Sequence, residues 1–315
     1  MHARQFECLW GNRINQMSSP FAALGNIHDT GEVQSRVNEI VHDFAPGHDL
    51  THINSAFTLL DQAFAGNLPG YEKLKTPYHN RMHTNEVVLC SARMLHGLHL
   101  SGRGLDDEHI DAALLGALMH DAGYLMRHEE AHGTGAQFTE THVIRGVDFA
   151  CQQLSDLPAN VMMALIKVIQ LTDHRQPANS VTFDNVQQRR AAYATASADL
   201  VGQMANRAYL ERLSLLYLEF VEANFIGFKD FHELLEKTTG FYQLTNLRLE
   251  HELGGLSPVL ARHFSAHEGM ERNFYLESIG SNLLYLQNIV REDRSRRLEL
   301  LKRGGIIKEV LADRD

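Results

Sequence analysis

The sequence predicts an all-α fold, and three observations support this prediction. Apolar residues recur at helical spacing through most of the chain, as in the stripe Val87, Cys90, Met94 and Leu98. Alternating β-branched runs are absent, since the nearest candidate for a strand, residues 180–183, is too short to carry a sheet. Only 7 Pro occur among 315 residues, and 44% of the residues are hydrophobic, so the chain can bury a sizeable core.

The helices can be placed in order along the chain. Residues 1–50 are expected to form loose short helices that end at the Ala-Pro-Gly turn of residues 45–47, and a longer helix follows over about 54–65. The central helices are expected over about residues 83–100, 107–121, 139–154, 159–174 and 185–220. Two or three helices should follow residue 250, the last over about 278–301.

No shift in composition marks a linker between domains. The simplest organisation is therefore a single helical domain with a core over residues 71–250, to which helical extensions over residues 1–70 and 251–315 are added. Helices at both ends of the chain are compatible with a homodimer.

Charge and cysteine content exclude several classes of protein. A net charge of −10 argues against a protein that coats nucleic acid, whose affinity depends on Lys and Arg. Cys8, Cys90 and Cys151 are far apart, which favours free thiols in a reducing compartment over a disulfide scaffold or a thiolate zinc site. Cys90 and Cys151 fall in apolar helical patterns and are expected to be structural.

No apolar run approaches the roughly 18 residues of a membrane span, and the first residues lack the apolar core of a signal peptide. We therefore expect a cytoplasmic protein without nucleic-acid or membrane partners.

The unusual feature of the composition is the presence of 19 His residues. His79 and His83 are four residues apart, so they share one face of a helix. His120 and Asp121 stand at the end of the helix predicted over 107–121. When the apolar stripe of this helix is continued by one turn, Asp121 falls on its buried face. A carboxylate there needs a hydrogen-bonding partner or a metal. Taken alone, each feature has an ordinary explanation: a chance pair of His residues, or an Asp exposed where the helix ends.

Three further side chains extend this pattern. His142 stands near the start of one amphipathic helix, and His174 ends another. A surface histidine or a satisfied core histidine accounts for each of them when it is taken alone. Asp199 lies in a segment of small residues that allows close helix approach, where it needs either a metal or a hydrogen-bonding partner.

Together these residues give the order His, His-Asp, His, His, Asp. They are His83, His120, Asp121, His142, His174 and Asp199. Successive positions are separated by 37, 22, 32 and 25 residues, when the His-Asp pair is counted from His120. Each gap is long enough for one helix and a turn. The ends of five helices can therefore meet at a common point. Four imidazoles and two carboxylates suffice for two divalent ions if one carboxylate bridges them. Such ligands favour Fe, Mn, Zn, Co or Ni, and Mg is compatible with one site.

This order resembles the HD superfamily of metal-dependent phosphohydrolases, named for an adjacent His-Asp pair, and in particular its two-metal members. The match covers about residues 78–200. The resemblance implies an all-α HD-type domain that hydrolyses a small-molecule phosphoester, often a nucleotide or cyclic nucleotide. The segment Tyr-His-Asn-Arg-Met-His at 78–83 is similar to the opening motif of the cyclic-nucleotide phosphodiesterases. By that resemblance, His79 would protonate the leaving group and His83 would bind metal.

The resemblance also implies how two metals would be shared among the ligands. One metal would be held by His83, His120, Asp121 and Asp199, and the other by His142, His174 and the bridging Asp121.

Departures from the family patterns leave the substrate-binding residues unassigned. The phosphodiesterases carry another His four residues after the His of the HD pair, where this chain has Tyr124. Asp usually follows their opening motif, where this chain has Glu86. The Lys and the GYP segment typical of the HD-GYP branch are also missing. Gln203 could read a base, although an ordinary polar helix residue is the simpler explanation.

Two other functions compete with the hydrolase. Some HD-fold proteins are di-iron oxygenases, and the ligand types in this sequence do not separate the two chemistries; iron content and O₂ consumption would. A non-catalytic binding or sensor module is less favoured, because such modules usually lose ligands and all six candidates are present here.

The segment from His128 to His132 matches the zincin pattern HExxH. In zincins this pattern lies within an apolar-faced helix, whereas here Arg127 precedes it and Gly133 follows at once, so the helix would be very short. We expect instead a lid or rim loop over the site, or an exposed polar loop without a role.

Overall fold

The computed structural model describes residues 19–130 and 132–312, and its regular elements there are all helices. The all-α prediction is confirmed. The only extended pairing in the described part of the chain is an isolated bridge between Tyr71 and Arg127. Residues 180–183, the nearest candidate for a strand, do not form one.

From residue 19 onward the N-terminal region is more regular than predicted, while residues 1–18 of the predicted range lie outside the described residues. Instead of loose short helices, α2 (Thr30–Phe44) is a 15-residue helix with one buried apolar face. Asp29 begins it, because its carboxylate accepts the backbone N–H of Glu32 at 3.0 Å. The next helix, α3 (Thr51–Ala65), ends as expected in a turn, where Gly66 adopts a left-handed conformation with φ of +79°.

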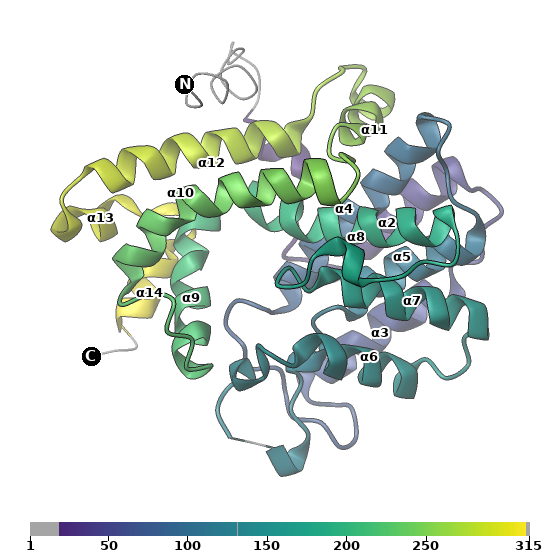
Figure 1. Cartoon of the computed structure of the whole chain (residues 1–315), viewed down its shortest axis with the longest axis horizontal. Helices are drawn as coiled ribbons and strands as arrows, with labels where there is room; N and C mark the ends of the chain where they lie inside the picture. Colours follow the sequence, from purple (N-terminus) through teal and green to yellow (C-terminus); the bar gives the residue numbers. More distant parts are fainter. Residues whose placement is uncertain (1–18, 131, 313–315) are drawn as a thin grey trace.

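The centre of the molecule is α4 (Arg81–Leu100), whose residues 83–98 are all buried. Neighbouring helices surround it, with α2 and α5 (Asp107–Met119) on some sides and α8 (Val186–Ala205) and α11 (Val259–Glu268) on others (Figure 1). A helix buried on every side cannot show a clean apolar stripe, so the stripe through Val87 and Leu98 marked only part of its contact surface.

The helices α6 (His142–Gln153) and α7 (Ala159–Thr172) complete the central group. The loop that follows α5 presses against the start of α6. A Cβ atom at Gly123 would lie 1.8 Å from the carbonyl oxygen of His142, so only glycine permits this approach. The contact fixes the beginning of α6 relative to the end of α5.

The long helix predicted over 185–220 is wrong in one respect, because it is two helices, α8 and α9 (Tyr209–Glu222). The break lies at Asn206, whose side chain competes with the helix for backbone partners. Its amide oxygen accepts the N–H of Ala208 at 2.7 Å, and its amide nitrogen donates to Glu86.

The C-terminal region also holds more helices than predicted. The helix α10 (Phe231–Leu247) runs into a π-helical turn, and between residue 250 and residue 312, where the description ends, there are four α-helices rather than two or three. They are α11, α12 (Phe274–Arg291), α13 (Arg294–Leu300) and α14 (Ile306–Ala312). In Figure 1, α12 and α10 run side by side. One hydrophobic cluster extends from Leu24 to Ile307, so helices of both terminal ranges share the core of the central range.

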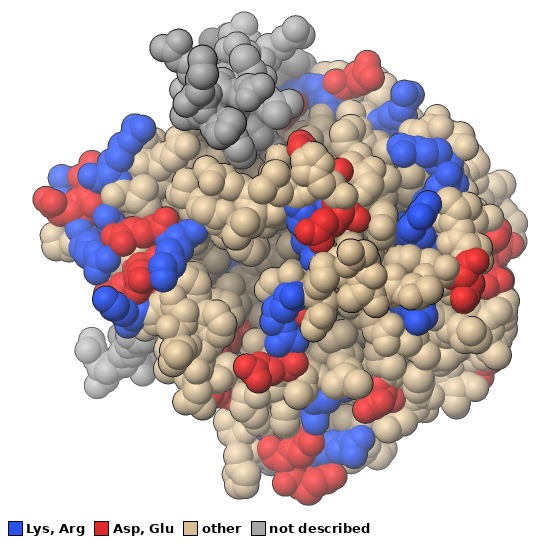
Figure 2. Space-filling model, viewed as in Figure 1, with Lys and Arg blue, Asp and Glu red and all other residues tan. Residues whose placement is uncertain are grey.

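The surface charges and the apolarity of the helices can be compared with the predictions from the sequence. On the face drawn in Figure 2, Lys and Arg are interspersed with Asp and Glu. Among the described helices, none has the length and apolarity that crossing a membrane requires.

Cys90 is a buried free thiol as expected, but Cys151 is exposed, because it lies on the outer side of α6. The apolar pattern around Cys151 therefore did not indicate burial of its side chain, and Cys8 lies outside the described residues.

Candidate metal centre

The His-Asp pair lies at the C-terminal end of α5. That helix ends at Met119, two residues before the predicted end, so His120 and Asp121 stand in the turn that follows rather than within the helix. Both side chains are buried, as expected for Asp121. Nε2 of His120 lies 3.1 Å from Oδ2 of Asp121.

Two other helices bring side chains to this pair. His83 is in the first turn of α4, and its Nε2 lies 3.3 Å from each of three atoms: Oδ2 of Asp121, Oδ1 of Asp199 and Nε2 of His120. Asp199 comes from α8, and the small residues around Asp199 allow α8 to pack closely on α4. A Cβ atom at Gly202 of α8, for example, would lie 3.2 Å from the carbonyl oxygen of Glu86 on α4. Four of the six proposed ligands therefore meet at one point.

The fifth candidate, His142, approaches from the opposite oxygen of the same carboxylate. Its Nε2 lies 3.8 Å from Oδ1 of Asp121, while Oδ2 faces His83 and His120. Asp121 thus stands between two imidazoles on one side and one on the other, which is the arrangement that a bridging carboxylate requires.

The sixth candidate, His174, lies just beyond the end of α7, and its side chain reaches solvent. The surrounding protein still removes enough water to lower the pKa of its imidazole, and the nearby charge of Asp199 opposes that effect. His174 lies beside the tight cluster rather than within it.

Backbone carbonyl groups determine which imidazole nitrogens face the cluster. Nδ1 of His120 lies 2.9 Å from the carbonyl oxygen of Ala117, and Nδ1 of His142 lies 2.7 Å from that of Thr139. A carbonyl oxygen can only accept, so each Nδ1 carries the hydrogen. In the neutral ring, each Nε2 then directs a lone pair toward Asp121, as metal-binding histidines do.

The donor atoms fit a divalent cation. Oδ2 of Asp121, the oxygen that faces His83 and His120, is buried and lacks a hydrogen-bond partner among the described residues. Lone pairs crowded at 3.1–3.3 Å repel one another unless protons or a cation lie between them. Nitrogen and oxygen ligands about 2.0–2.2 Å from one ion are separated by roughly 3.0–3.6 Å, so these spacings suit a shared metal.

The pKa values within the cluster show how strongly the charges interact. Burial lowers the pKa of His83, but contacts with Asp121, Asp199 and Glu86 outweigh it and hold the pKa well above its usual value. Burial also opposes ionisation of Asp121, yet the nearby His120 and His79 keep its pKa well below the ordinary range. The carboxylates therefore favour their ionised form, which is the form that binds a cation.

His79 stands apart from these ligands and is held by Glu219, a residue that sequence analysis missed. Glu219 lies on α9, is almost fully buried, and accepts the backbone N–H groups of Tyr78 at 2.7 Å and His79 at 3.1 Å. Its other carboxylate oxygen contacts Nδ1 of His79. No short-range pattern could have revealed this partner, because 140 residues separate the two.

Tyr124 connects the proposed acid with a proposed ligand. Its ring lies nearly parallel to the ring of His79, at 4.6 Å between centroids, and to the ring of His142, at 4.7 Å. The position that carries a His in the phosphodiesterases therefore holds an aromatic spacer here.

A second layer of side chains supports the ligands. Both carboxylate oxygens of Glu86 accept from Arg212, at 2.7 and 2.8 Å, and one of them, Oε2, also lies 3.7 Å from Nδ1 of His83. Gln203 accepts the hydroxyl of Tyr78 at 2.7 Å, and its amide nitrogen lies 3.4 Å from Oδ1 of Asp199. Gln203 thus positions protein groups, in line with the simpler explanation of this residue.

The segment that matches HExxH does not form a zincin helix in its described residues. His128 begins a single 3-10 turn, and its exposed ring contacts Glu72 at 2.8 Å. Arg145 ties Glu130 to α6 through two contacts of 2.8 Å. Thr134 then binds Glu222 of α9, so the segment is anchored at both sides of the loop.

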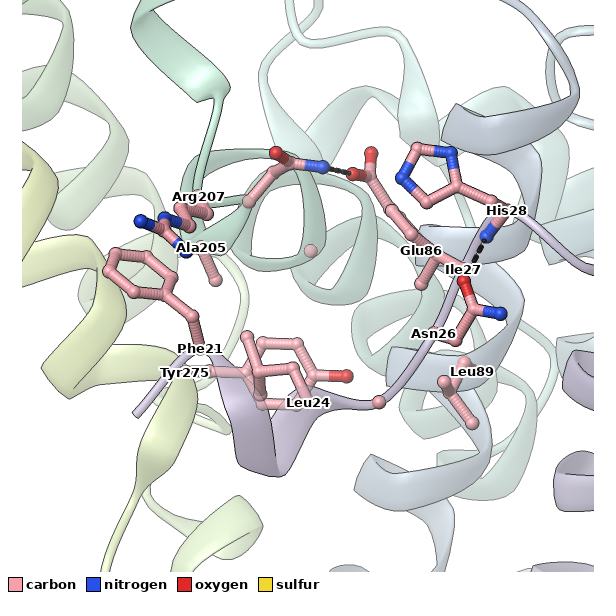
Figure 3. Close-up of a pocket in the computed structure, with 13 residues that line it drawn as sticks. Phe21, Leu24, Asn26, Ile27, His28, Glu86, Leu89, Ala205, Arg207 and Tyr275 are labelled. Atoms are coloured by element: carbon pink, nitrogen blue, oxygen red, sulfur yellow. Dashed lines mark hydrogen bonds between the residues drawn. The ribbon is translucent and has the colours of Figure 1, made fainter. Parts of the chain in front are cut away.

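A separate cavity of about 160 Å³ is lined by Glu86 but not by His83. Figure 3 shows Phe21, Arg207 and Tyr275 around it, with the hydrogen bond from Asn206 to Glu86 at its wall. The proposed ligands do not line this cavity, so it is distinct from the metal centre.

Comparison with known proteins adds one finding. A family model described as Npun_R2479-like matches residues 125–250. The matched segment includes His142, His174, Asp199 and Glu219 but begins after the His-Asp pair. No curated protein and no solved structure matches the chain.

Proposed function

We propose that this protein is a phosphohydrolase that depends on two divalent transition-metal ions and acts on a small-molecule phosphoester, such as a nucleotide or cyclic nucleotide. The observation that carries the proposal is the position of Asp121, whose two oxygens face His83 and His120 on one side and His142 on the other. Two ions bridged by one carboxylate are the basis of many phosphoester hydrolases.

The ligands divide into two sets around Asp121. One ion would be held by His83, His120, Asp121 and Asp199. The other would be held by His142 and His174 together with Asp121. When bound, such ions lower the pKa of water and neutralise the charge that develops on the phosphoryl oxygens.

The chain itself supplies the proton for the leaving group. Glu219 holds Nδ1 of His79, so Nε2 is the nitrogen that is free to pass a proton to the departing oxygen. The same carboxylate stabilises the positive charge of the imidazole while it carries that proton. Tyr124 limits rotation of the His79 ring through their near-parallel contact.

The deciding experiment measures metal content and turnover together. Purified protein is analysed for metals, reloaded with Mn²⁺, Fe²⁺, Co²⁺ or Zn²⁺, and assayed against nitrophenyl phosphate mono- and diesters and a panel of nucleotides. We expect about two ions per chain at the centre and hydrolysis of at least one substrate class. Bound iron with O₂ consumption and no phosphoester turnover would instead favour the di-iron oxygenase.

A cytoplasmic location is also part of the proposal. It is supported by the free thiols of Cys90 and Cys151, since reduced cysteines are typical of that compartment.

A further inference from the structure

We propose that the protein has a second metal site, built from His96, His263 and His267, which binds a single Zn²⁺ ion. Each of these residues offers one ring nitrogen, and the three nitrogens lie within 4.8 Å of one another. The site joins α4 to α11. It shares no residue with the candidate metal centre and does not depend on the proposed hydrolase activity.

The geometry of the three rings favours ligation. Nδ1 of His96 lies 2.9 Å from Nδ1 of His263, and the ring of His267 is 4.6 Å from that of His263 and 5.3 Å from that of His96, between centroids. Two imidazoles around one Zn²⁺ place their nitrogens about 3.3 Å apart, so a movement of a few tenths of an ångström would suffice. Three histidines leave a fourth position open for water.

The helices come close enough at this point to hold such a site. A Cβ atom at Gly97 would lie 2.2 Å from the carbonyl oxygen of Val259, so the backbones of α4 and α11 are in direct contact next to His96. His96 and His263 are both buried and face each other across this contact. The close approach therefore restrains two of the three ligands before any ion binds.

A carboxylate outside the ring of ligands orients the third histidine. Oδ2 of Asp43, on α2, lies 3.4 Å from Nε2 of His267. A carboxylate that accepts from one imidazole nitrogen leaves the other with a lone pair, which is the usual support for a zinc-bound histidine. Phe44, the next residue along α2, stacks on His96 at 5.8 Å between centroids. The ion would thus tie α2, α4 and α11 together.

The charge around the cluster is compatible with neutral imidazole ligands. Arg93, on the same helix as His96, holds its guanidinium over the ring of Phe264, the residue next to His263, at 5.5 Å from its centroid. The guanidinium of Arg93 donates to the carbonyl oxygen of Leu24 and to the hydroxyl of Tyr275 instead of to the histidines. Asp43 supplies the negative charge closest to the cluster.

An ordinary N–H···N hydrogen bond between His96 and His263 is the competing explanation. It accounts for the 2.9 Å contact, but it requires neither His267 nor Asp43. The substitution of His267, whose side chain is 38% exposed, therefore separates the two explanations without removing a core residue.

The test is a Zn²⁺ titration of the full chain after removal of metals with a chelator. Wild type is compared with His267→Ala, with Asp43→Asn and with His42→Ala, an exposed histidine on α2 that serves as the control. We expect wild type and His42→Ala to bind one more Zn²⁺ per chain than His267→Ala. Asp43→Asn should keep this stoichiometry but bind the additional ion about 10–100-fold more weakly.

Thermal unfolding and absorption give independent readouts. Zn²⁺ should raise the Tm of wild type more than that of His267→Ala, and saturating Co²⁺ should give stronger visible absorption in wild type than in the variant, which keeps only the candidate metal centre. All four proteins retain the candidate metal centre, so the difference between them is independent of whether that centre is catalytic. Equal Zn²⁺ stoichiometry and equal Tm shifts in wild type and His267→Ala would refute the second site. Circular dichroism of the metal-free proteins checks folding, and His267→Gln replaces the Ala variant if that one is unfolded.

Discussion

Tyr124 lies nearly parallel to His142, with ring centroids 4.7 Å apart and planes inclined by 14°. The same ring contacts His79 at 4.6 Å, so one aromatic side chain positions both the proposed acid and a proposed ligand. Tyr124 is almost fully buried, and its position follows the His-Asp pair by only a few residues. The turn after α5 thus supplies two ligands and the spacer that packs against the next helix.

The first prediction concerns this spacer. Tyr124→Phe keeps the ring and should retain most activity and stability. Tyr124→Ala removes a buried ring and should cost about 3–5 kcal/mol of unfolding free energy, together with most of the turnover. Urea unfolding and a phosphoester assay of both variants test this. Equal losses in the two variants would show that the hydroxyl, rather than the ring, is what matters.

The second prediction separates the acid from the ligands. His79→Ala should retain metal but slow turnover by roughly 10²–10⁴-fold, because it removes the proton donor. The loss should shrink for nitrophenyl esters, whose leaving oxygen needs little protonation. His128→Ala, which alters an exposed histidine bonded to Glu72, is the control and should behave like wild type. A uniform loss across leaving groups would remove His79 from the acid role, and loss of metal would make it a ligand.

The third prediction concerns the bridge. Asp121→Asn preserves the shape of the side chain but removes the charge that two cations would share, so metal content should fall at both positions. Metal analysis of the purified variant measures this. Asp156→Asn, at a position where the carboxylate is 77% exposed, should leave metal content unchanged. Full metal occupancy in Asp121→Asn would contradict the ligand assignment.

The fourth prediction is a pH dependence remote from the metal centre. His48 contacts Asp111 at 2.9 Å and Asp107 at 3.1 Å, and these carboxylates raise its pKa above 6.5 in the folded protein. Its contribution to stability is therefore fully present below the unfolded pKa and is lost as pH rises through the folded one. The difference in unfolding free energy between metal-free wild type and His48→Gln should be larger at about pH 5.5 than at about pH 9. A difference that does not vary with pH would count against this ion pair.

The fifth prediction concerns the thiols. Burial raises the pKa of Cys90 to about 12, so this thiol should react with a thiol reagent only after unfolding. Cys151 is exposed, and Cys151→Ser should remove one rapidly reacting thiol from the folded protein. Replacing Cys90 and Cys151 with Ala should leave metal content intact, because neither lies in the cluster. Loss of metal in that double variant would mean that the ligand set is misassigned.

Several features of the protein followed from the sequence because they depend on local spacing. The apolar stripes of α4 and α5 recur at helical intervals, and the order of His83, the His-Asp pair, His142, His174 and Asp199 can be read along the chain. Asp121 could be identified as an anomaly because a carboxylate next to an apolar stripe is costly unless it is paired. The hydrogen bonds of Asn206, in contrast, broke a helix that periodicity alone extended to residue 220.

The tertiary structure decided which side chains meet and which groups orient them. Glu219 contacts His79 across 140 residues, and Arg212 pairs with Glu86 across 126, so no local pattern could have indicated either contact. The cluster of His96, His263 and His267 arises only where α4 and α11 touch at Gly97. Helical periodicity shows which face of a helix is buried, but the neighbour of that face depends on the packing of the whole chain, because the hydrophobic effect is not directional.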